Sequence, residues 1–405
     1  MPVGLSEPSS IASVAGVRLA SVAAGIKKNG SDDLVVFAFD EGACVAATFT
    51  QNAFCAAPVT LAKNHLSQSS PRALLINSGN ANAGTGHAGM KNAEQTCQWL
   101  AEALGCDTAQ VLPFSTGVIG EQLPMDAMRS GIEKIVPQLA GENWLAAAQG
   151  IRTTDIVAKG ASRSVMLDGR EITISGISKG SGMIRPDMAT MLAFIATDAR
   201  VEQGFLQQCL SGAVAQSFNA ITVDGDTSTN DACVLAATGA AGNQELNAGS
   251  AGASVFADAV ASLCRQLAQA IVRDGEGATK FVTVDIEQAA SVDEARQVAY
   301  TIAHSPLVKT ALFASDPNWG RILAAVGRAG VENLDISRVN LYLGDVCIVC
   351  AGGVAEDYRE EKGQAVMDRE EITIQVELGR GDSSAQIWTT DLSHEYVRIN
   401  SEYRS

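Results

Sequence analysis

The chain has 405 residues, of which 46% are hydrophobic and 18% charged, so its apolar content suffices for one large domain or for two to three ordinary ones. Its formal net charge of −16 argues against binding to nucleic acids or anionic membranes and favours a small-molecule role. Most of the acidity lies in residues 190–405, which carry 29 acidic and 15 basic side chains.

The amino-terminal residues contain no cationic segment followed by an apolar run, so no signal peptide is expected. No stretch of about 18 uncharged apolar residues occurs, so no membrane-spanning segment is expected either. The nine cysteines are an odd number and lie mostly in apolar segments. They suit reduced, buried thiols in a cytoplasmic protein.

Short apolar runs typical of strands alternate with stretches of helical periodicity. The runs at 34–40 and 44–50 flank a turn-like EGA and predict a β-hairpin. Further strands are expected at 74–76, 171–175, 191–196, 281–286, 339–343, 347–351 and 372–376. Helices are expected at 87–104, 124–139, 201–216, 251–271 and 291–303. This order predicts an α+β fold with mixed, largely antiparallel sheets and helical outer layers.

The pattern of histidines and cysteines does not favour a metal site. His65, His87, His304 and His394 share no ligand spacing, and Cys347–Cys350 is a lone CxxC pair in an apolar run. A zinc site would need a second pair, and a thioredoxin motif would need a helix N-terminus. Buried structural cysteines are therefore the favoured interpretation, and no metal is expected.

The acidic segment DGDTSTND at 224–231 resembles a calcium loop only superficially. The twelfth position, which should be glutamate, is Leu235. A turn stabilised by side-chain hydrogen bonds is the simpler interpretation, and active-site scaffolding is the alternative.

Two glycine-containing turns follow expected strands. The segment 77–86 (NSGNANAGTG) matches neither a P-loop nor GxGxxG, so tight turns are the simpler interpretation and an active-site role the alternative. The segment 115–120 (STGVIG) places a hydroxyl pair and a glycine after a strand. Such a turn can present a backbone N–H and a hydroxyl to a developing oxyanion, although an ordinary turn or cap is also possible.

Thr190 lies near the middle of the chain, after a glycine-rich cationic loop and before an apolar run, in KGSGMIRPDMATML at 179–192. If the preceding peptide bond were cut, Thr190 would become an N-terminal nucleophile. Its own α-amine, with an ordinary pKa near 8, would then serve as the base. This chemistry needs neither a histidine nor an aspartate partner.

With these motifs the chain resembles the ornithine acetyltransferases, the bifunctional glutamate N-acetyltransferases of arginine biosynthesis. The resemblance spans essentially the whole chain and rests on eight motifs in register. They are NSGNANAGTG, STGVIG, TTD at 153–155, KGSGMIRPDMATML, TVDGDTSTND, RDGEGATK at 273–280, SDPNWGRI at 315–322 and the tail RINSEYRS.

The resemblance implies a layered α-β-β-α sandwich, similar to N-terminal nucleophile hydrolases and of the ornithine acetyltransferase/β-aminopeptidase type. It also implies self-cleavage between Ala189 and Thr190, giving an α chain of residues 1–189 and a β chain of residues 190–405. An assembly of α2β2 or larger and a cytoplasmic location are expected.

The resemblance also implies roles for particular residues. Thr190 corresponds to the nucleophile, and Thr116 and Gly117 correspond to the oxyanion hole. The substrate-binding positions are Thr153, Lys179, Thr190, Glu276, Asn400 and Ser405. Lys179 suits an α-carboxylate. Glu276 suits the ammonium group of acetylornithine, although by itself it could also be a solvated loop charge.

The implied reaction moves an acetyl group from N-acetylornithine to glutamate through acetyl-Thr190, without a cofactor and with ping-pong kinetics. Acetyl-CoA is a possible further donor. One alternative is an amidohydrolase of the β-aminopeptidase kind, which would release the acyl group to water. Another is a non-catalytic amino-acid-binding protein, which would remain a single intact chain.

Overall fold

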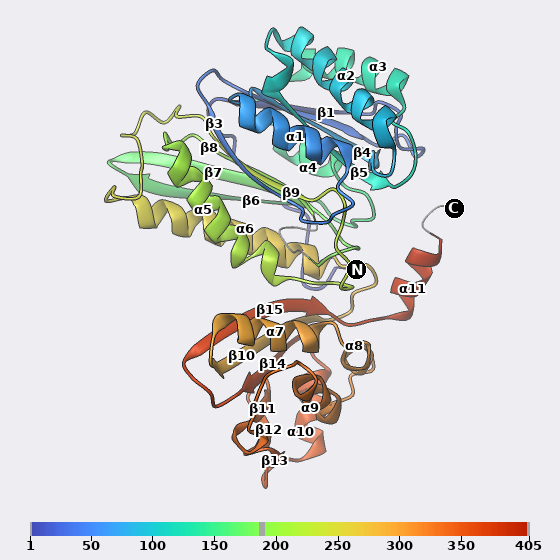
Figure 1. Cartoon of the computed structure of the whole chain (residues 1–405), viewed down its shortest axis with the longest axis vertical. Helices are drawn as coiled ribbons and strands as arrows, with labels where there is room; N and C mark the ends of the chain where they lie inside the picture. Colours follow the sequence, from blue (N-terminus) through green and yellow to red (C-terminus); the bar gives the residue numbers. More distant parts are fainter. Residues whose placement is uncertain (1, 186–190, 403–405) are drawn as a thin grey trace. The chain divides into compact units, whose positions relative to one another are not determined.

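The computed structural model describes residues 2–185 and 191–402, which form two compact units (Figure 1). We call Glu7–Asn219 with Asp226–Ile271 the sandwich unit, and Met1–Ser6, Ala220–Gly225 and Val272–Ser405 the single-sheet unit. The sandwich unit contains strands from both sides of the predicted cleavage position. The compact units therefore differ in extent from the two chains that cleavage would produce.

Two sheets build the sandwich unit. The first has the order β1-β2-β4-β5, with bounds Val17–Val22, Leu34–Phe39, Ala73–Asn80 and Val111–Val118. The second has the order β3-β9-β8-β7-β6, with bounds Cys44–Phe49, Ala232–Ala237, Leu192–Thr197, Arg170–Lys179 and Lys159–Leu167. β2, β8 and β9 are buried at every residue, which explains why their sequences are continuous apolar runs rather than alternating ones.

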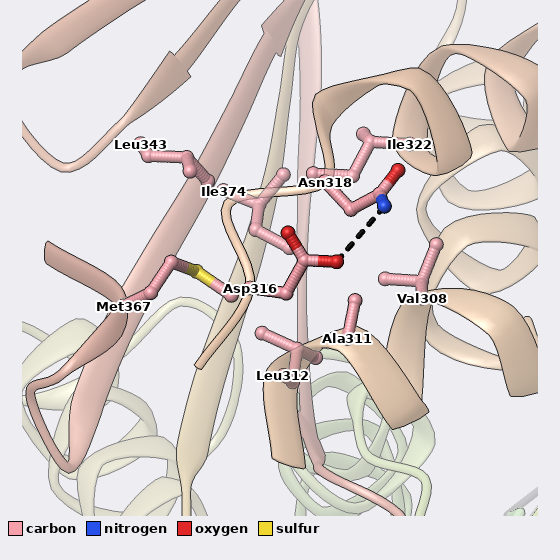
Figure 2. A pocket seen from close by; sticks show the side chains of 9 residues that line it. All are labelled: Val308, Ala311, Leu312, Asp316, Asn318, Ile322, Leu343, Met367 and Ile374. Carbon is pink, nitrogen blue, oxygen red and sulfur yellow. Dashed lines mark hydrogen bonds between the residues drawn. The ribbon is translucent and has the colours of Figure 1, made fainter. Parts of the chain in front are cut away.

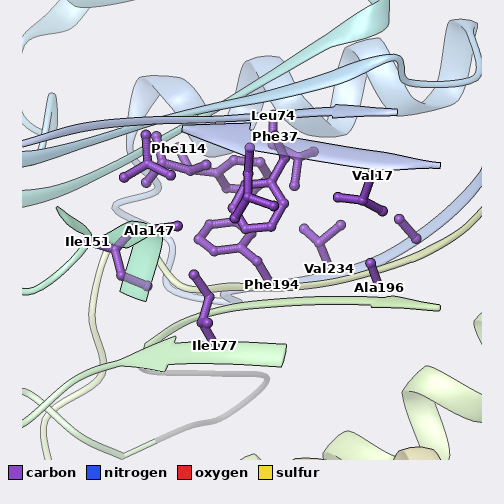
Figure 3. Close-up of a cluster of buried hydrophobic side chains, with 14 of the residues drawn as sticks. Val17, Phe37, Leu74, Phe114, Ala147, Ile151, Ile177, Phe194, Ala196 and Val234 are labelled. Carbon is purple, nitrogen blue, oxygen red and sulfur yellow. The ribbon is translucent and has the colours of Figure 1, made fainter. Parts of the chain in front are cut away.

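Aromatic side chains fill the space between the two sheets (Figure 3). Phe37 and Phe114 come from the first sheet and Phe194 from the second, with ring centroids 5.7 Å and 5.1 Å from that of Phe194. Trp144 packs edge-on against Phe37 at 5.5 Å from the helix α4 (Trp144–Gly150). The apolar faces of both sheets thus share one core, as the sandwich prediction requires.

Helices cover the outer faces of the two sheets. The first sheet packs on α1 (Ala57–Gln68), α2 (Gly86–Leu104) and α3 (Met125–Ile135), and the second on α5 (Gln203–Ala215) and α6 (Ala253–Arg273). α6 is long and apolar enough to cross a membrane, but 56% of its apolar window is buried within the protein. The predicted α+β class and its layered α-β-β-α sandwich are confirmed.

The predicted hairpin at 34–50 is wrong, although both of its strands exist. β2 pairs with β1 on one edge and β4 on the other, while β3 pairs with β9 in the second sheet. Both edges of β2 are occupied, so β3 has no free edge to join. The turn between them, with Gly42 at φ +90°, carries the chain from one sheet to the other.

The single-sheet unit contains one mixed sheet with helices packed on it. Its strand order is β13-β12-β11-β14-β10-β15, with bounds Gly353–Val354, Val346–Cys350, Asn340–Leu343, Glu371–Glu377, Phe281–Ala289 and Ser383–Thr390. Its helices are α7 (Val292–Ala303), α8 (Pro306–Phe313), α9 (Trp319–Gly327), α10 (Glu360–Met367) and α11 (His394–Ser401). Short 3-10 turns in the chain lie at Thr108–Gln110, Val136–Gln138, Phe218–Ala220 and Ile336–Arg338.

The pairing of strands is largely antiparallel, as predicted. Parallel pairs join β4 to β5, β8 to β9 and β10 to β14, and the other described pairs are antiparallel. The expectation of buried cysteines holds only in part. Cys97, Cys209, Cys233 and Cys264 are buried, whereas Cys350 of the CxxC pair is exposed. The pair lies on β12, next to the short strand β13 at the margin of the sheet, where the apolar run is not covered on both faces.

Candidate active site

The ammonium group of Lys179 brings together three of the predicted site residues. Lys179 ends β7 and is 8% exposed. Its Nζ donates to Thr153 Oγ1 at 2.7 Å and to Thr116 Oγ1 at 3.2 Å. These residues are 26 and 63 positions away along the chain, so the fold gathers them from three separate segments. A buried cation among hydroxyl groups forms a polar cluster suited to binding an anionic group.

Asp155 fixes the residues of this cluster through hydrogen bonds. Its Oδ1 accepts hydrogen bonds from Lys159 Nζ at 2.6 Å and from the Gly180 N–H at 2.7 Å, and its Oδ2 accepts from the Thr153 N–H at 3.1 Å. Burial opposes ionisation of this carboxyl, but Lys159 and Lys179, with these hydrogen bonds, outweigh burial and hold the pKa of Asp155 below its ordinary value. Asp155 therefore fixes both Thr153 and the turn that follows Lys179.

Thr116 and Gly117 lie near the end of β5, beside β4. In this parallel pair Ser78 is opposite Thr116, and Gly79 is opposite Gly117. Gly117 has φ +136°, and a Cβ built there would lie 2.2 Å from the carbonyl carbon of Gly79. Only glycine fits this position, because both the backbone angle and the close approach exclude a side chain.

Buried asparagines fix the glycine-rich turn that follows β4. Asn77 Nδ2 donates to the Asn80 carbonyl at 2.8 Å, and Ser115 Oγ donates to Asn77 Oδ1 at 2.5 Å. From the acidic segment, Asn230 Nδ2 donates to the carbonyls of Ala81 and Ser115 at 2.6 and 2.9 Å. The two motifs that seemed to be ordinary turns therefore brace the strand that carries Thr116. Their alternative interpretation, as scaffolding of a site, agrees with this geometry.

The strands β7, β8 and β9 place Lys179 next to the residues that follow Thr190. Lys179 is opposite Leu192 across the antiparallel pair β7–β8, and Leu192 is opposite Ala232 across the parallel pair β8–β9. Thr190 and Ala189 themselves lie outside the described residues, as does Ser405. The register nevertheless brings Lys179 level with a residue only two positions after the predicted nucleophile.

Glu276 and Asn400 lie together in the single-sheet unit. Glu276 is 8% exposed, and its Oε2 accepts a hydrogen bond from Asn400 Nδ2 on α11 at 2.8 Å. The neighbouring loop is tied to the same segment, because Ser393 Oγ donates to the Gly277 carbonyl at 2.6 Å. Asp391 accepts from the Lys280 N–H at 2.9 Å. Glu276 is thus a held, mostly buried carboxylate and not a solvated loop charge.

One cavity in the single-sheet unit is too small to bind a substrate. It lies between α8, α9 and the sheet, and Figure 2 shows Asp316 and Asn318 among its mostly apolar lining side chains. Its volume is about 10 Å³, which is room for about one water molecule. Asn318 donates to Asp316 Oδ2 at 2.9 Å, so these polar groups also satisfy each other.

Sequence reasoning did not single out Asp155, Lys159 or Asp231. Asp155 stands in the TTD motif, and Asp231 ends the acidic segment at 224–231. Neither position has a signal of its own, since an aspartate near threonines is typical of turns. Their burial, which only the fold creates, distinguishes them from solvated carboxylates.

Comparison with known proteins gives matches over the whole chain. The profile of the ArgJ family matches residues 18–405. The arginine biosynthesis bifunctional protein ArgJ of Pseudomonas fluorescens (strain Pf0-1) is 56% identical over 408 residues, which is 100% of both chains.

Two solved structures are also similar. The chain of ArgJ from Bacillus halodurans is 40% identical, with a TM-score of 0.50, and the match covers 52% of this chain and 99% of that one. The ornithine acetyltransferase of Mycobacterium tuberculosis, solved with ornithine, is 33% identical, with a TM-score of 0.38, over 44% of this chain and 94% of that one.

Proposed function

Since the chain belongs to the ArgJ family, we propose that the residues around Lys179 perform acetyl transfer on the nucleophile Thr190. The protein is an ornithine acetyltransferase of arginine biosynthesis. It moves the acetyl group of N-acetylornithine to glutamate, and the products are ornithine and N-acetylglutamate. The roles of individual residues below are our assignments.

Maturation comes first. The chain cleaves itself between Ala189 and Thr190, which creates the free α-amine that the reaction needs. Two observations support this step. The register of β7 and β8 places Lys179 opposite Leu192, just after this bond. The solved Bacillus halodurans chain corresponds to about half of this one, as expected if relatives consist of two chains.

Cleavage leaves the two chains joined. β6 and β7 belong to residues 1–189, whereas β8 and β9 belong to residues 190–405, and all four lie in one sheet. The β7–β8 pair therefore becomes an interface between the α and β chains, stabilised by backbone hydrogen bonds and the shared core. An α2β2 assembly or a larger one extends this αβ unit.

In the first half-reaction, Thr190 Oγ attacks the acetyl carbonyl carbon of N-acetylornithine while the Thr190 α-amine accepts the hydroxyl proton. The oxyanion is held by the Gly117 N–H and the Thr116 hydroxyl. Because Lys179 donates to Thr116 Oγ1, the hydroxyl hydrogen of Thr116 remains available to donate to the oxyanion. The C–N bond breaks, the departing nitrogen takes the proton, and acetyl-Thr190 remains.

In the second half-reaction, the amine of glutamate attacks the ester carbonyl of acetyl-Thr190. The same donors hold the second oxyanion, and Thr190 Oγ leaves with a proton. Each half-reaction uses only groups of the chain and its substrates, so the proposal requires no metal or organic cofactor. Glutamate and ornithine occupy the acyl-enzyme in turn, which gives ping-pong kinetics.

Both substrates carry an α-carboxylate, which Lys179 and Thr153 bind in this assignment. The ornithine side chain ends in an ammonium group, for which Glu276 supplies a held carboxylate, oriented by Asn400. Thr190 and Ser405 complete the assigned binding residues.

The observation that carries this function is the pair of hydrogen bonds from Lys179 to Thr116 and Thr153. It joins the residues assigned to the oxyanion and to the carboxylate within one polar cluster. The test measures release of ornithine from N-acetylornithine, with and without glutamate. Transfer requires turnover that depends on glutamate and yields N-acetylglutamate. Sustained turnover in water alone would instead indicate the amidohydrolase.

A second activity is favoured by the name of the relatives, which are described as bifunctional. Acetyl-CoA can acetylate the same Thr190 Oγ, with its thiolate as leaving group, and glutamate then accepts the acetyl group. The test supplies acetyl-CoA and glutamate without N-acetylornithine. Formation of N-acetylglutamate and free thiol supports the second activity, and absence of both contradicts it.

A further inference from the structure

The assigned binding residues provide no cation for the side-chain carboxylate of glutamate. Glutamate differs from N-acetylornithine at the end of its side chain, which carries a carboxylate instead of an ammonium group. Lys179 and Thr153 are assigned to the α-carboxylate that both substrates share, and Glu276 is assigned to the ammonium group. Because carboxylates are bound most strongly by charge-assisted hydrogen bonds, a further cation is expected close to this site.

Lys27 lies beside the strand pair that carries the assigned oxyanion hole. A Cβ built at Gly79 would lie 3.1 Å from Lys27 Cγ, so the aliphatic part of this lysine covers Gly79. Gly79 is opposite Gly117 in the parallel pair β4–β5. The backbone that leads to Lys27 is fixed, because the Asp33 carboxylate accepts hydrogen bonds from the N–H groups of residues 24–27 at 2.6 to 3.1 Å. The position of Lys27 next to the site is therefore determined by the sandwich unit itself.

The ammonium group of Lys27 lies at the end of α4, close to Thr153. Its Nζ donates to the Gly150 carbonyl at 3.3 Å, and Gly150 is the last residue of α4, three positions before Thr153. The same carbonyl accepts a hydrogen bond from Ser78 Oγ at 2.6 Å. Ser78 is opposite Thr116 in the pair β4–β5. Lys27 is thus connected, through one carbonyl group, to both segments of the candidate site.

Lys27 and Arg152 each retain N–H donors for a further acceptor. An ammonium group has three N–H donors, and within the described residues Lys27 uses two of them, for the carbonyls of Gly150 and Asp32 at 3.3 and 2.8 Å. Arg152 follows Gly150 by two positions, and its Nη1 donates to the Ile156 carbonyl at 2.9 Å. Its Nε is buried and has no hydrogen-bond partner in the part of the chain that the structure describes. Because buried polar atoms nearly always have a partner, this Nε indicates a missing acceptor.

The charges around Lys27 also favour a bound anion. Burial, together with the nearby cations Arg152 and Lys179, lowers the pKa of Lys27 to about 8. Asp33 and Asp155 oppose this shift without cancelling it. Both carboxylates are buried and already accept several hydrogen bonds. Positive charge therefore remains in excess, and a bound carboxylate would stabilise the charged form of Lys27.

We propose that Lys27 and Arg152 together bind the side-chain carboxylate of glutamate and so select the acetyl acceptor. The inference rests on the proposed function, since it concerns the second half-reaction only. The two carboxylate carbons of an extended glutamate are about 5 Å apart, so with a hydrogen bond at each end the molecule spans roughly 10 Å between two cations. Gly150 and Thr153, which accept from the two lysine ammonium groups, are three residues apart and so at most about 11 Å. One glutamate can therefore reach both cations.

Lys27→Gln tests this assignment, because it removes the charge while its amide group can still donate to the Gly150 carbonyl. Lys28→Gln is the matched control, since Lys28 is the adjacent lysine and is exposed. Matured protein is first acetylated with N-acetylornithine and freed of ornithine. The rate at which the acetyl-enzyme is then discharged is measured with glutamate and with glutamine, which has nearly the same shape but no side-chain charge.

We expect kcat/KM for discharge by glutamate to fall on the order of 10- to 100-fold in Lys27→Gln, because a charge-assisted hydrogen bond is lost. Discharge by glutamine should change little, so the preference for glutamate should fall by the same factor. Acetylation by N-acetylornithine should fall far less, because that substrate has no second carboxylate. Lys27→Arg retains a positive charge and should recover part of the preference. Lys28→Gln should match the wild type in both half-reactions.

A matured Lys27→Gln enzyme that keeps the wild-type preference for glutamate over glutamine would overturn the proposal. Equal losses in both half-reactions would also overturn it, because Lys27 would then only support the end of α4. If Lys27→Gln does not fold, Arg152→Gln decides: a reduced preference for glutamate supports the proposal, and an unchanged preference contradicts it. Failure of the wild type to form the acetyl-enzyme, or to discharge it to glutamate, would show instead that the proposed function itself is wrong.

Discussion

Gly117 and Gly79 face each other across the parallel strands β5 and β4 so closely that no side chain fits between them. A Cβ at Gly117 would lie 2.2 Å from the carbonyl carbon of Gly79 and 2.5 Å from the Asn80 nitrogen. The N–H assigned to the oxyanion is therefore fixed by backbone packing rather than by a flexible loop. This arrangement also explains why the NSGN and STG motifs belong together.

Gly117→Ala should lower kcat by about 10²- to 10³-fold, because the displaced backbone no longer presents its N–H to the oxyanion. Gly120→Ala is the matched control, since Gly120 also has positive φ, +87°, but has open space around its Cβ position. Both variants are assayed as matured protein, together with their melting temperatures. Equal kcat values for the two variants would remove Gly117 from the oxyanion role.

Thr116→Ala should lower kcat, on the order of 10²-fold, more than it changes KM, because the hydroxyl acts on a charge that develops only in the transition state. Thr116→Ser retains the hydroxyl and should recover most of the rate. Pre-steady-state acetylation of matured enzyme measures the effect. A serine variant as slow as the alanine variant would mean that packing of the methyl group, and not the hydroxyl, matters.

Asp155→Asn should destabilise the sandwich unit by about 3–5 kcal/mol, because it leaves the Lys159 ammonium buried without its counterion. Replacing Lys159 as well, in Asp155→Asn with Lys159→Met, should restore part of this loss. Denaturant unfolding at neutral pH measures both. The idea of a buried, coupled pair fails if the double variant is no more stable than Asp155→Asn alone.

The same pair predicts how stability depends on pH. The folded-state pKa of Asp155 lies below its unfolded value of about 3.9, so its stabilisation is complete at neutral pH. It is lost as pH falls below about 4 toward the folded-state pKa. The Asp155→Asn variant should lack this component, so its stability should decline less steeply in acid than that of the wild type.

Glu276→Gln keeps the shape of the side chain and its contact with Asn400 but removes the charge. We expect kcat/KM for N-acetylornithine to fall about 5- to 150-fold, the equivalent of about 1–3 kcal/mol, and the glutamate half-reaction to change less. Glu287→Gln, at a half-buried carboxylate on β10, is the control. Equal losses in the two half-reactions would mean that Glu276 supports the unit generally and does not recognise the ammonium.

Much of the sandwich unit was predictable, because its central strands are buried on both faces and so appear as continuous apolar runs. Which strands pair with each other was less predictable. The short turn between β2 and β3 has the length of a hairpin, and only the occupied edges of β2 reveal that the chain changes sheets. β6 and β15 were missed because their polar, partly exposed residues interrupt any apolar run.

In the candidate site, too, some residues could be predicted from the sequence and others could not. Lys179, Thr153 and Thr116 were identified through the family resemblance, and the structure brings their side chains together. Asp155 and Asp231 have no distinctive spacing, since what sets them apart is burial next to a lysine or next to Met191. Such features arise from long-range packing, which local sequence patterns do not encode.

The central claim, a threonine nucleophile made by self-cleavage, is tested most directly by intact-mass spectrometry of the purified protein before and after addition of N-acetylornithine. We predict two chains, the second beginning TMLAFIA, and a gain of one acetyl group on that second chain only, which glutamate then removes. Thr190→Ala should remain one chain without the adduct. A single unmodified wild-type chain that still transfers acetyl groups, or a Thr190→Ala protein that splits at the same bond, would contradict the account.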